Sequence, residues 1–188
     1  MRTLAAVLAL AFLAAGCGPS EEAPAGPEAD PAATTTGEPP RLVSITADGL
    51  QEEIRALDAD AVVLNVWATW CGPCRVEFPE FVRYSRDKAG EGVAVRFLSV
   101  DESGDLARVQ QFLVEHGVSG RTYLTAEGTD IVAALAAPNR WAYGIPVTLI
   151  YGPDGELRDF WEGTVNYDFL DAKVQRVLAA AGETAAAG

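Results

Sequence analysis

Two cysteines separated by two residues, Cys71 and Cys74, are the side chains in this sequence best suited to chemistry. They follow a dense apolar run at 61–67 that predicts a buried strand, and they stand at the start of a segment that predicts a helix. Backbone N–H groups and the dipole at a helix start stabilise a thiolate, and a second thiol within reach can resolve a mixed disulfide. We therefore predict a redox-active disulfide, with Cys71 as the exposed nucleophile and Cys74 as the more buried resolving residue.

The motif Cys71-Gly72-Pro73-Cys74 lies within a longer segment, 65–79, that resembles the thioredoxin superfamily and, more narrowly, the TlpA/ResA-like membrane-anchored oxidoreductases. The resemblance implies an α/β, thioredoxin-like fold with a central mixed β-sheet flanked by helices. It also implies an insertion, at 118–143, before a cis-proline loop. The implied function is reduction of protein disulfides, in cytochrome c maturation among other pathways, with a membrane electron donor and no cofactor.

The same resemblance implies a substrate-binding edge beside the cysteines. Gly144-Ile145-Pro146 looks like the family's cis-proline loop, and Trp70 looks like the tryptophan next to its disulfide. A cis bond before Pro146 turns the chain tightly and leaves the backbone of Ile145 free to pair with an extended substrate. We therefore expect Ile145, Pro146 and Trp70 to contact substrate. The alternative is an ordinary trans proline at the start of a strand.

Glu77 lies three residues after Cys74, where the TlpA/ResA-like group often has a glutamate near the cysteines. A carboxylate there would raise the pKa of a nearby thiol and accept the proton released when a mixed disulfide resolves. Thioredoxin has a buried aspartate where this chain has Asn65, so Glu77 is our candidate for the acid–base role. The alternative is a solvated helix residue outside the chemistry.

The N-terminal residues have the pattern of a secretory signal, because Met1-Arg2 is followed by an apolar run at 4–15. This run is shorter than the ~20 residues of a spanning helix. Residues 13–17, Leu-Ala-Ala-Gly-Cys, resemble a bacterial lipoprotein box, which predicts a signal peptide at 1–16 and lipidation of Cys17. An ordinary secretory signal is the alternative.

The remaining chain divides by composition. Residues 17–40 are rich in Pro, Ala and acidic residues, which predicts a tether that forms no core. We expect a folded domain at 41–181 and a flexible tail at 182–188. The expected location is the bacterial cell envelope, where the anchored domain faces the periplasm or another extracytoplasmic space, and the expected state is a monomer.

Charge excludes one class of partner. The formal net charge is −13, and the 14 basic residues are scattered singly, whereas nucleic-acid binders need clusters of Lys and Arg. The expected partners are protein disulfides or thiols, the electron donor, and the membrane through the lipid.

Other cysteine chemistries fit less well. No metal is expected, because two cysteines and the single His116 supply too few ligands for a closed zinc site. Haem attachment needs His where Arg75 stands, and a peroxidatic cysteine needs a hydroxyl residue where Ala68 stands. A noncatalytic thioredoxin-like lipoprotein with a structural disulfide remains an alternative, although so small a ring adds little chain-entropy stabilisation. An oxidase or isomerase would use the same motif.

Overall fold

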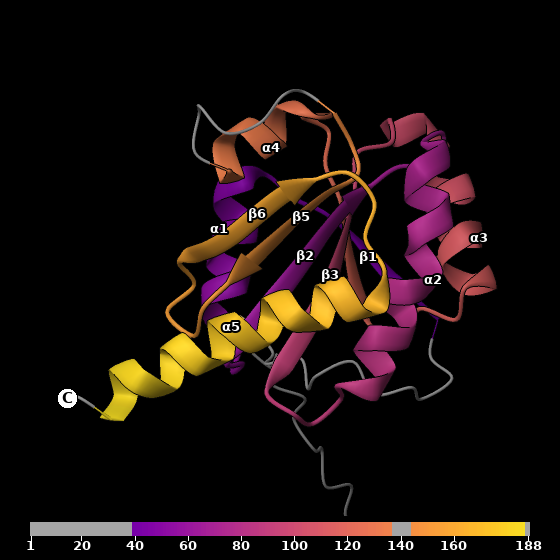
Figure 1. Cartoon of the computed structure of the whole chain (residues 1–188). Coiled ribbons are helices and arrows are strands. Elements are labelled where there is room, and N and C mark those ends of the chain that lie inside the picture. The colour runs from indigo at the N-terminus through magenta and orange to yellow at the C-terminus, as the bar shows by residue number, and fades with distance from the viewer. Residues whose placement is uncertain (1–38, 137–143, 187–188) are drawn as a thin grey trace, which may run out of the picture.

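A six-stranded mixed β-sheet forms the centre of the fold (Figure 1). The computed structural model describes residues 39–136 and 144–186. The strand order is β1-β4-β3-β2-β5-β6; the first four strands are parallel, and β5 and β6 are antiparallel to their neighbours. The strands are β1 (Arg41–Ser44), β2 (Ala61–Trp67), β3 (Val93–Ser99), β4 (Arg121–Leu124), β5 (Val147–Tyr151) and β6 (Leu157–Glu162).

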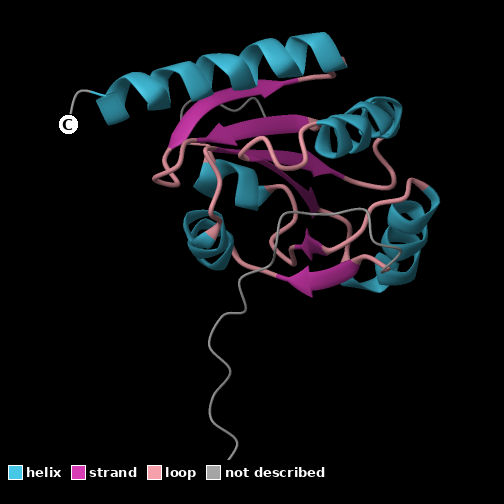
Figure 2. Ribbon diagram, turned by 90° about the horizontal axis from the view of Figure 1, so that it is seen from below, coloured by secondary structure: helices cyan, strands magenta, loops and turns pink. Residues whose placement is uncertain are grey.

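Helices cover both faces of this sheet, with α2, α3 and α5 on one face and α1 and α4 on the other (Figures 1 and 2). The α/β class and the mixed sheet flanked by helices are confirmed. Within the described ranges, no helix is long and apolar enough to cross a membrane. The helices are α1 (Ala47–Ala56), α2 (Gly72–Asp87), α3 (Leu106–Glu115), α4 (Asp130–Leu135) and α5 (Tyr167–Ala186), with a 3-10 turn at Ser103–Asp105.

The core holds β2 and α2 rigidly against each other. Every residue of β2 and β3 is buried, as expected for apolar, β-branched runs covered on both faces. The ring of Trp67, the last residue of β2, lies 4.7 Å from the ring of Phe78 in α2 and 4.8 Å from that of Phe112 in α3. Aromatic pairs of this kind stabilise a core beyond the area that they bury. The chain between β2 and α2 therefore starts and ends on fixed elements.

The C-terminal helix is longer than the sequence pattern predicts. We expected the domain to end at residue 181 and a flexible tail to follow, but α5 continues to Ala186. Alanine has the highest helix propensity, so the alanine-rich end extends the helix despite Gly182. The signal peptide, Cys17 and most of the tether lie outside the described residues, as do residues 137–143 of the predicted insertion. The described part of that insertion contains β4 and α4.

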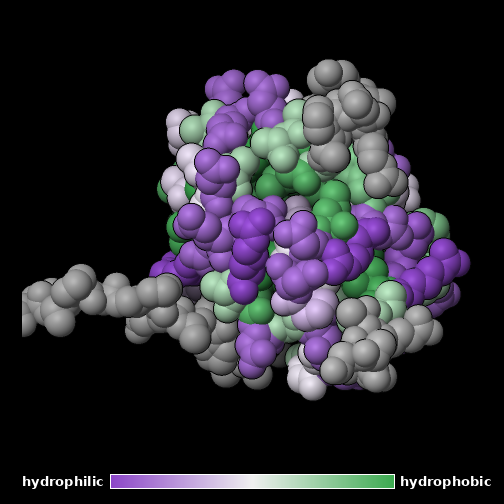
Figure 3. Space-filling view, turned by 90° about the vertical axis from the view of Figure 1, so that its left-hand side faces the viewer, coloured by the Kyte–Doolittle hydropathy of each residue, from purple (hydrophilic) through white to green (hydrophobic). Residues whose placement is uncertain are grey.

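One face of the domain is mainly polar (Figure 3). Figure 3 shows a face on which hydrophilic residues predominate and apolar side chains are exposed between them. Trp70, which is exposed, stands directly before Cys71 in the chain. In the described ranges the exposed large apolar side chains are Trp70, Val76, Leu106, Val114 and Phe169.

Candidate active site

The two cysteines form a disulfide at the N-terminus of α2, with their Cα atoms 5.3 Å apart. Cys71 is the N-cap residue of the helix, and its sulfur accepts a hydrogen bond of 3.2 Å from the N–H of Cys74. Pro73 occupies the first turn, where its fixed φ suits a helix start and its missing N–H is not needed. The predicted pairing is present, and the first sulfur lies where a helix stabilises negative charge.

The two sulfurs differ in exposure, but less than we expected. Cys71 has 5% of its surface exposed and Cys74 has none. The prediction of an exposed nucleophile is therefore wrong, although Cys71 is the more exposed of the two cysteines. The Cys71 Sγ faces the Ile145 carbonyl at 3.7 Å, so the loop before β5 lies against the sulfur. Cys74 lies wholly inside the domain.

The loop before β5 supplies the opposite side of the site. The Ile145–Pro146 peptide bond is cis, as predicted. Beyond it, the Pro146 carbonyl accepts a hydrogen bond from the N–H of Gly163 at 2.9 Å. Trp70 is 59% exposed and precedes Cys71, so an aromatic surface adjoins the disulfide. The structure brings Trp70, Ile145 and the cysteines to one end of the sheet.

Glu77 is buried in the domain, which excludes the alternative of a solvated helix residue; 2% of its surface is exposed. Its Oε1 accepts a bond from Asn65 Nδ2, and its Oε2 accepts one from the N–H of Val165, both at 2.9 Å. Burial raises the pKa of Glu77 to about 7, and the hydrogen bonds from Val165 and Asn65 offset part of that rise. The side chain can therefore take up and release a proton near neutral pH.

Glu77 also has a suitable position relative to the resolving cysteine. Residues three apart on a helix lie on the same face, and Cys74 and Glu77 are both buried on the inner face of α2. Asn65 extends from β2 beneath this face and orients the carboxylate. Thus the two residues are neighbours because of helix geometry, while β2 fixes the direction of the acid.

One buried acid near the disulfide, Asp101, was not predicted from the sequence. Asp101 stands two residues after the end of β3 and is completely buried. It accepts hydrogen bonds from Thr69, which lies between β2 and Cys71. An acid at the carboxyl end of a buried parallel strand is a usable signal, because functional groups collect at that edge of α/β sheets.

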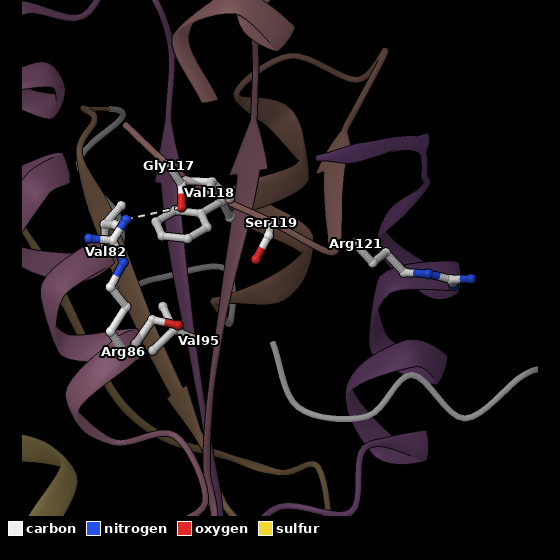
Figure 4. A pocket seen from close by; sticks show the side chains of 9 residues that line it. Val82, Arg86, Val95, Gly117, Val118, Ser119 and Arg121 are labelled. Atoms are coloured by element: carbon white, nitrogen blue, oxygen red, sulfur yellow. Dashed lines mark hydrogen bonds between the residues drawn. The ribbon is translucent and has the colours of Figure 1, made fainter. Parts of the chain in front are cut away.

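A separate pocket lies between the second half of α2, β3 and the chain that follows α3 (Figure 4). Arg86 reaches across it and donates a hydrogen bond of 3.1 Å to the Gly117 carbonyl. Arg86 stands twelve positions after Cys74 in α2, a rise of about 18 Å, so the pocket is not part of the disulfide site. In the parts of the chain that the structure describes, no group of three or more His, Cys, Asp or Glu side chains could hold a metal ion.

A family model described as the AhpC/TSA family matches residues 37–160, about two thirds of the chain. The chain belongs to the AhpC/TSA family. The thiol-disulfide oxidoreductase ResA of Bacillus anthracis is 33% identical over 143 residues, which cover 74% of this chain and 76% of the relative. ResA of Bacillus subtilis is 27% identical over 131 residues, which cover 70% of this chain and 69% of that protein.

Two further matches are a relative in sequence and a solved structure that shares the fold. The thiol:disulfide interchange protein HelX of Rhodobacter capsulatus is 28% identical over 156 residues, which cover 81% of this chain and 82% of HelX. The crystal structure of a thioredoxin-family thiol:disulfide interchange protein from Chlorobium tepidum superposes with a TM-score of 0.56 at 23% identity, covering 82% of this chain and 99% of that one. The predicted thioredoxin-like fold and the place of this AhpC/TSA member among thiol-disulfide oxidoreductases are confirmed.

Proposed function

We propose that this protein reduces disulfides in other proteins outside the cytoplasm, by dithiol–disulfide exchange at Cys71 and Cys74. The observation that carries the proposal is the Cys71 sulfur at the cap of α2, 3.2 Å from the N–H of Cys74, with the second sulfur within bonding reach. Stabilisation of the Cys71 thiolate by the helix end makes it the attacking group.

The reaction proceeds in two exchanges. The Cys71 thiolate attacks one sulfur of a substrate disulfide; that S–S bond breaks, and the departing substrate thiolate takes a proton. The Cys74 thiolate then attacks the Cys71 sulfur of the mixed disulfide and releases the second substrate thiolate. The substrate gains two electrons and two protons, and the protein is left with the Cys71–Cys74 disulfide. A membrane electron donor would restore the dithiol.

Glu77 would serve as the proton acceptor in the second exchange. Cys74 must lose its proton before it can attack, and it has no exposed surface through which water could remove that proton. Glu77 lies on the same helix face, and its pKa of about 7 matches a base at neutral pH. Asn65 and Val165 would hold the Glu77 side chain in the same place before and after it accepts the proton.

Substrate would bind along Ile145 and Pro146, next to Trp70. The Ile145 carbonyl lies 3.7 Å from the attacking sulfur, so a chain paired with this backbone would present its disulfide to Cys71. Gly72 and Pro73 are exposed at the entrance, and an added Cβ at Gly72 would meet no atom within 4 Å. The exposed part of the motif would therefore lie beside the substrate, while the Cys71 sulfur itself is largely buried.

The proposed direction is reductive. Thioredoxin, with a potential of about −270 mV, is a reductant, and this chain has a thioredoxin-like Gly72-Pro73 dipeptide between its cysteines. Resemblance to the TlpA/ResA-like group makes cytochrome c maturation the candidate pathway. The reduction potential of the pair tests the direction, because a reductant must have a lower potential than its substrates. An inert pair would instead favour the noncatalytic binding protein with a structural disulfide.

The proposed location is the outer side of a bacterial membrane, with a lipid on Cys17 and the 17–40 segment as tether. We expect the full-length protein in the membrane fraction and Cys17→Ser in the soluble fraction, because several acyl chains together hold a protein to a bilayer. Cys71→Ser is the control, since it also loses one thiol but keeps the anchor. A Cys17→Ser protein that stays with membranes as firmly as wild type would exclude lipidation of Cys17 as the anchor.

A further inference from the structure

Asp101 is a buried carboxylate that the exchange steps above do not use. Its Oδ2 accepts hydrogen bonds from the backbone N–H of Thr69 at 2.9 Å and from Ser99 Oγ at 2.7 Å. Its Oδ1 accepts a bond from Thr69 Oγ1 at 2.5 Å. None of its surface is exposed. Three donors therefore converge on one carboxylate at the end of β3.

These bonds fasten the connection between β2 and α2. At the start of the connection, the N–H of Val100 donates to the carbonyl of Trp67 at 3.0 Å, which continues the pairing of the two strands. Thr69 stands between Trp67 and Cys71, and Asp101 binds both its backbone and its side chain. The position of Thr69 in turn fixes where the chain enters the helix cap that carries the attacking sulfur.

We infer that Asp101 is a positioning residue for disulfide exchange: through Thr69 it holds Trp70 and Cys71 where a substrate disulfide can meet the Cys71 sulfur. The inference rests on the proposed exchange at Cys71. Such positioning affects the rate strongly, because a displacement of about 1 Å in a reacting group can cost about a hundredfold.

The chemistry of the side chain explains the use of an acid. A carboxylate only accepts hydrogen bonds, so it can bind an N–H and two hydroxyl groups at once. Asparagine has the same shape, and its carbonyl oxygen at the Oδ2 position can still accept from the Thr69 N–H and from Ser99. Its NH2 group at the Oδ1 position can donate to Thr69 Oγ1, because that hydroxyl can turn to accept. Alanine offers no acceptor. Asparagine should therefore preserve the position of Thr69, and alanine should not.

The test compares four pre-reduced variants with wild type in their rate of reaction with oxidised glutathione and in the reduction potential of the cysteine pair. Asp101→Ala should react about ten- to a hundredfold more slowly, and Asp101→Asn should restore most of the rate. Thr69→Val replaces the hydroxyl with a methyl group and keeps the backbone N–H, so its reaction should slow by about three- to tenfold. Asp154→Ala, at the far end of the β5–β6 hairpin, is the control and should react like wild type.

The outcomes separate positioning from simple stabilisation. A residue that only stabilises the fold changes the melting temperature, but not the rate of each folded molecule or the potential. If folded Asp101→Ala matches wild type in both, the inference is wrong, whereas a slow alanine variant rescued by asparagine supports it. If Asp101→Ala does not fold, Thr69→Val decides, and a wild-type rate there overturns the inference. A wild-type protein that itself fails to react contradicts the proposed exchange instead.

Discussion

Cys74→Ser should turn the protein into a trap that binds its substrate covalently and releases it extremely slowly. The Cys71 thiolate can still attack, because its helix cap depends on the backbone N–H of residue 74 and not on the side chain. The mixed disulfide then lacks its internal resolving thiol. Well-placed intramolecular groups act at very high effective concentrations, so turnover should fall by a factor on the order of a thousand or more.

The measurement is non-reducing electrophoresis and mass spectrometry of the variant after incubation with a protein disulfide substrate. A covalent adduct through Cys71 should accumulate, and added dithiothreitol should reduce its mixed disulfide and release the substrate. Cys71→Ser is the matched control, with the same substitution at the other sulfur, and should form no adduct, because Cys74 has no exposed surface from which to attack. Equal adducts from both variants would contradict the assigned roles.

Glu77→Gln should change how both exchange and stability depend on pH. In wild type the pKa of Glu77 is about 7, so the carboxylate that accepts the Cys74 proton forms as pH rises through 7. Turnover should rise across that range in wild type and lose this rise in the variant. The pH profile of Cys71 alkylation in the reduced protein should also change, because the variant has no neighbouring charge to raise the pKa of the thiols.

The effect on stability has a definite sign. The pKa of Glu77 is higher in the folded state than its ordinary 4.5, so the group's contribution to stability is fully present below pH 4.5 and is lost as pH rises through about 7. The free energy of unfolding of wild type, relative to Glu77→Gln, should therefore fall by roughly 3 kcal/mol between pH 4.5 and 8. Denaturant titrations at several pH values measure this difference.

Glu80→Gln provides the control for both experiments. It makes the same chemical change one turn along α2, at a partly exposed side chain that binds the N–H of Tyr167. It should follow wild type in turnover and in the pH dependence of stability. A Glu77→Gln protein whose profiles run parallel to those of wild type and Glu80→Gln would exclude the acid–base role.

Local patterns in the sequence predict those parts of the site whose residues are close in the chain. The spacing of Cys71 and Cys74 predicts the disulfide, and the apolar run at 61–67 predicts β2, because both depend on neighbours. The burial of Glu77 depends on Val165, 88 residues away, and residue-by-residue patterns contain no sign of that contact. The bonds between Thr69 and Asp101 span 32 residues and are hidden for the same reason.

Exposure is the property that the sequence predicts least well. The nucleophile of an exchange reaction is expected at the surface, but the fold places the Ile145 carbonyl against the sulfur of Cys71 and leaves only 5% of the residue exposed. That contact forms between segments 74 residues apart, so it follows from the topology of the sheet. At the C-terminus, a flexible tail was expected from residue 182, yet the alanine-rich end continues α5 to Ala186.

The reduction potential of the Cys71–Cys74 pair tests the central claim most directly. The purified protein is equilibrated in redox buffers of graded potential, its thiols are trapped by alkylation, and the peptide that contains both cysteines is quantified by mass spectrometry. A reversible two-electron transition near or below about −250 mV is the result we expect for a reductase. A value near about −120 mV, or a pair that resists both reduction and alkylation in the folded protein, would contradict the reductive exchange proposed for this site.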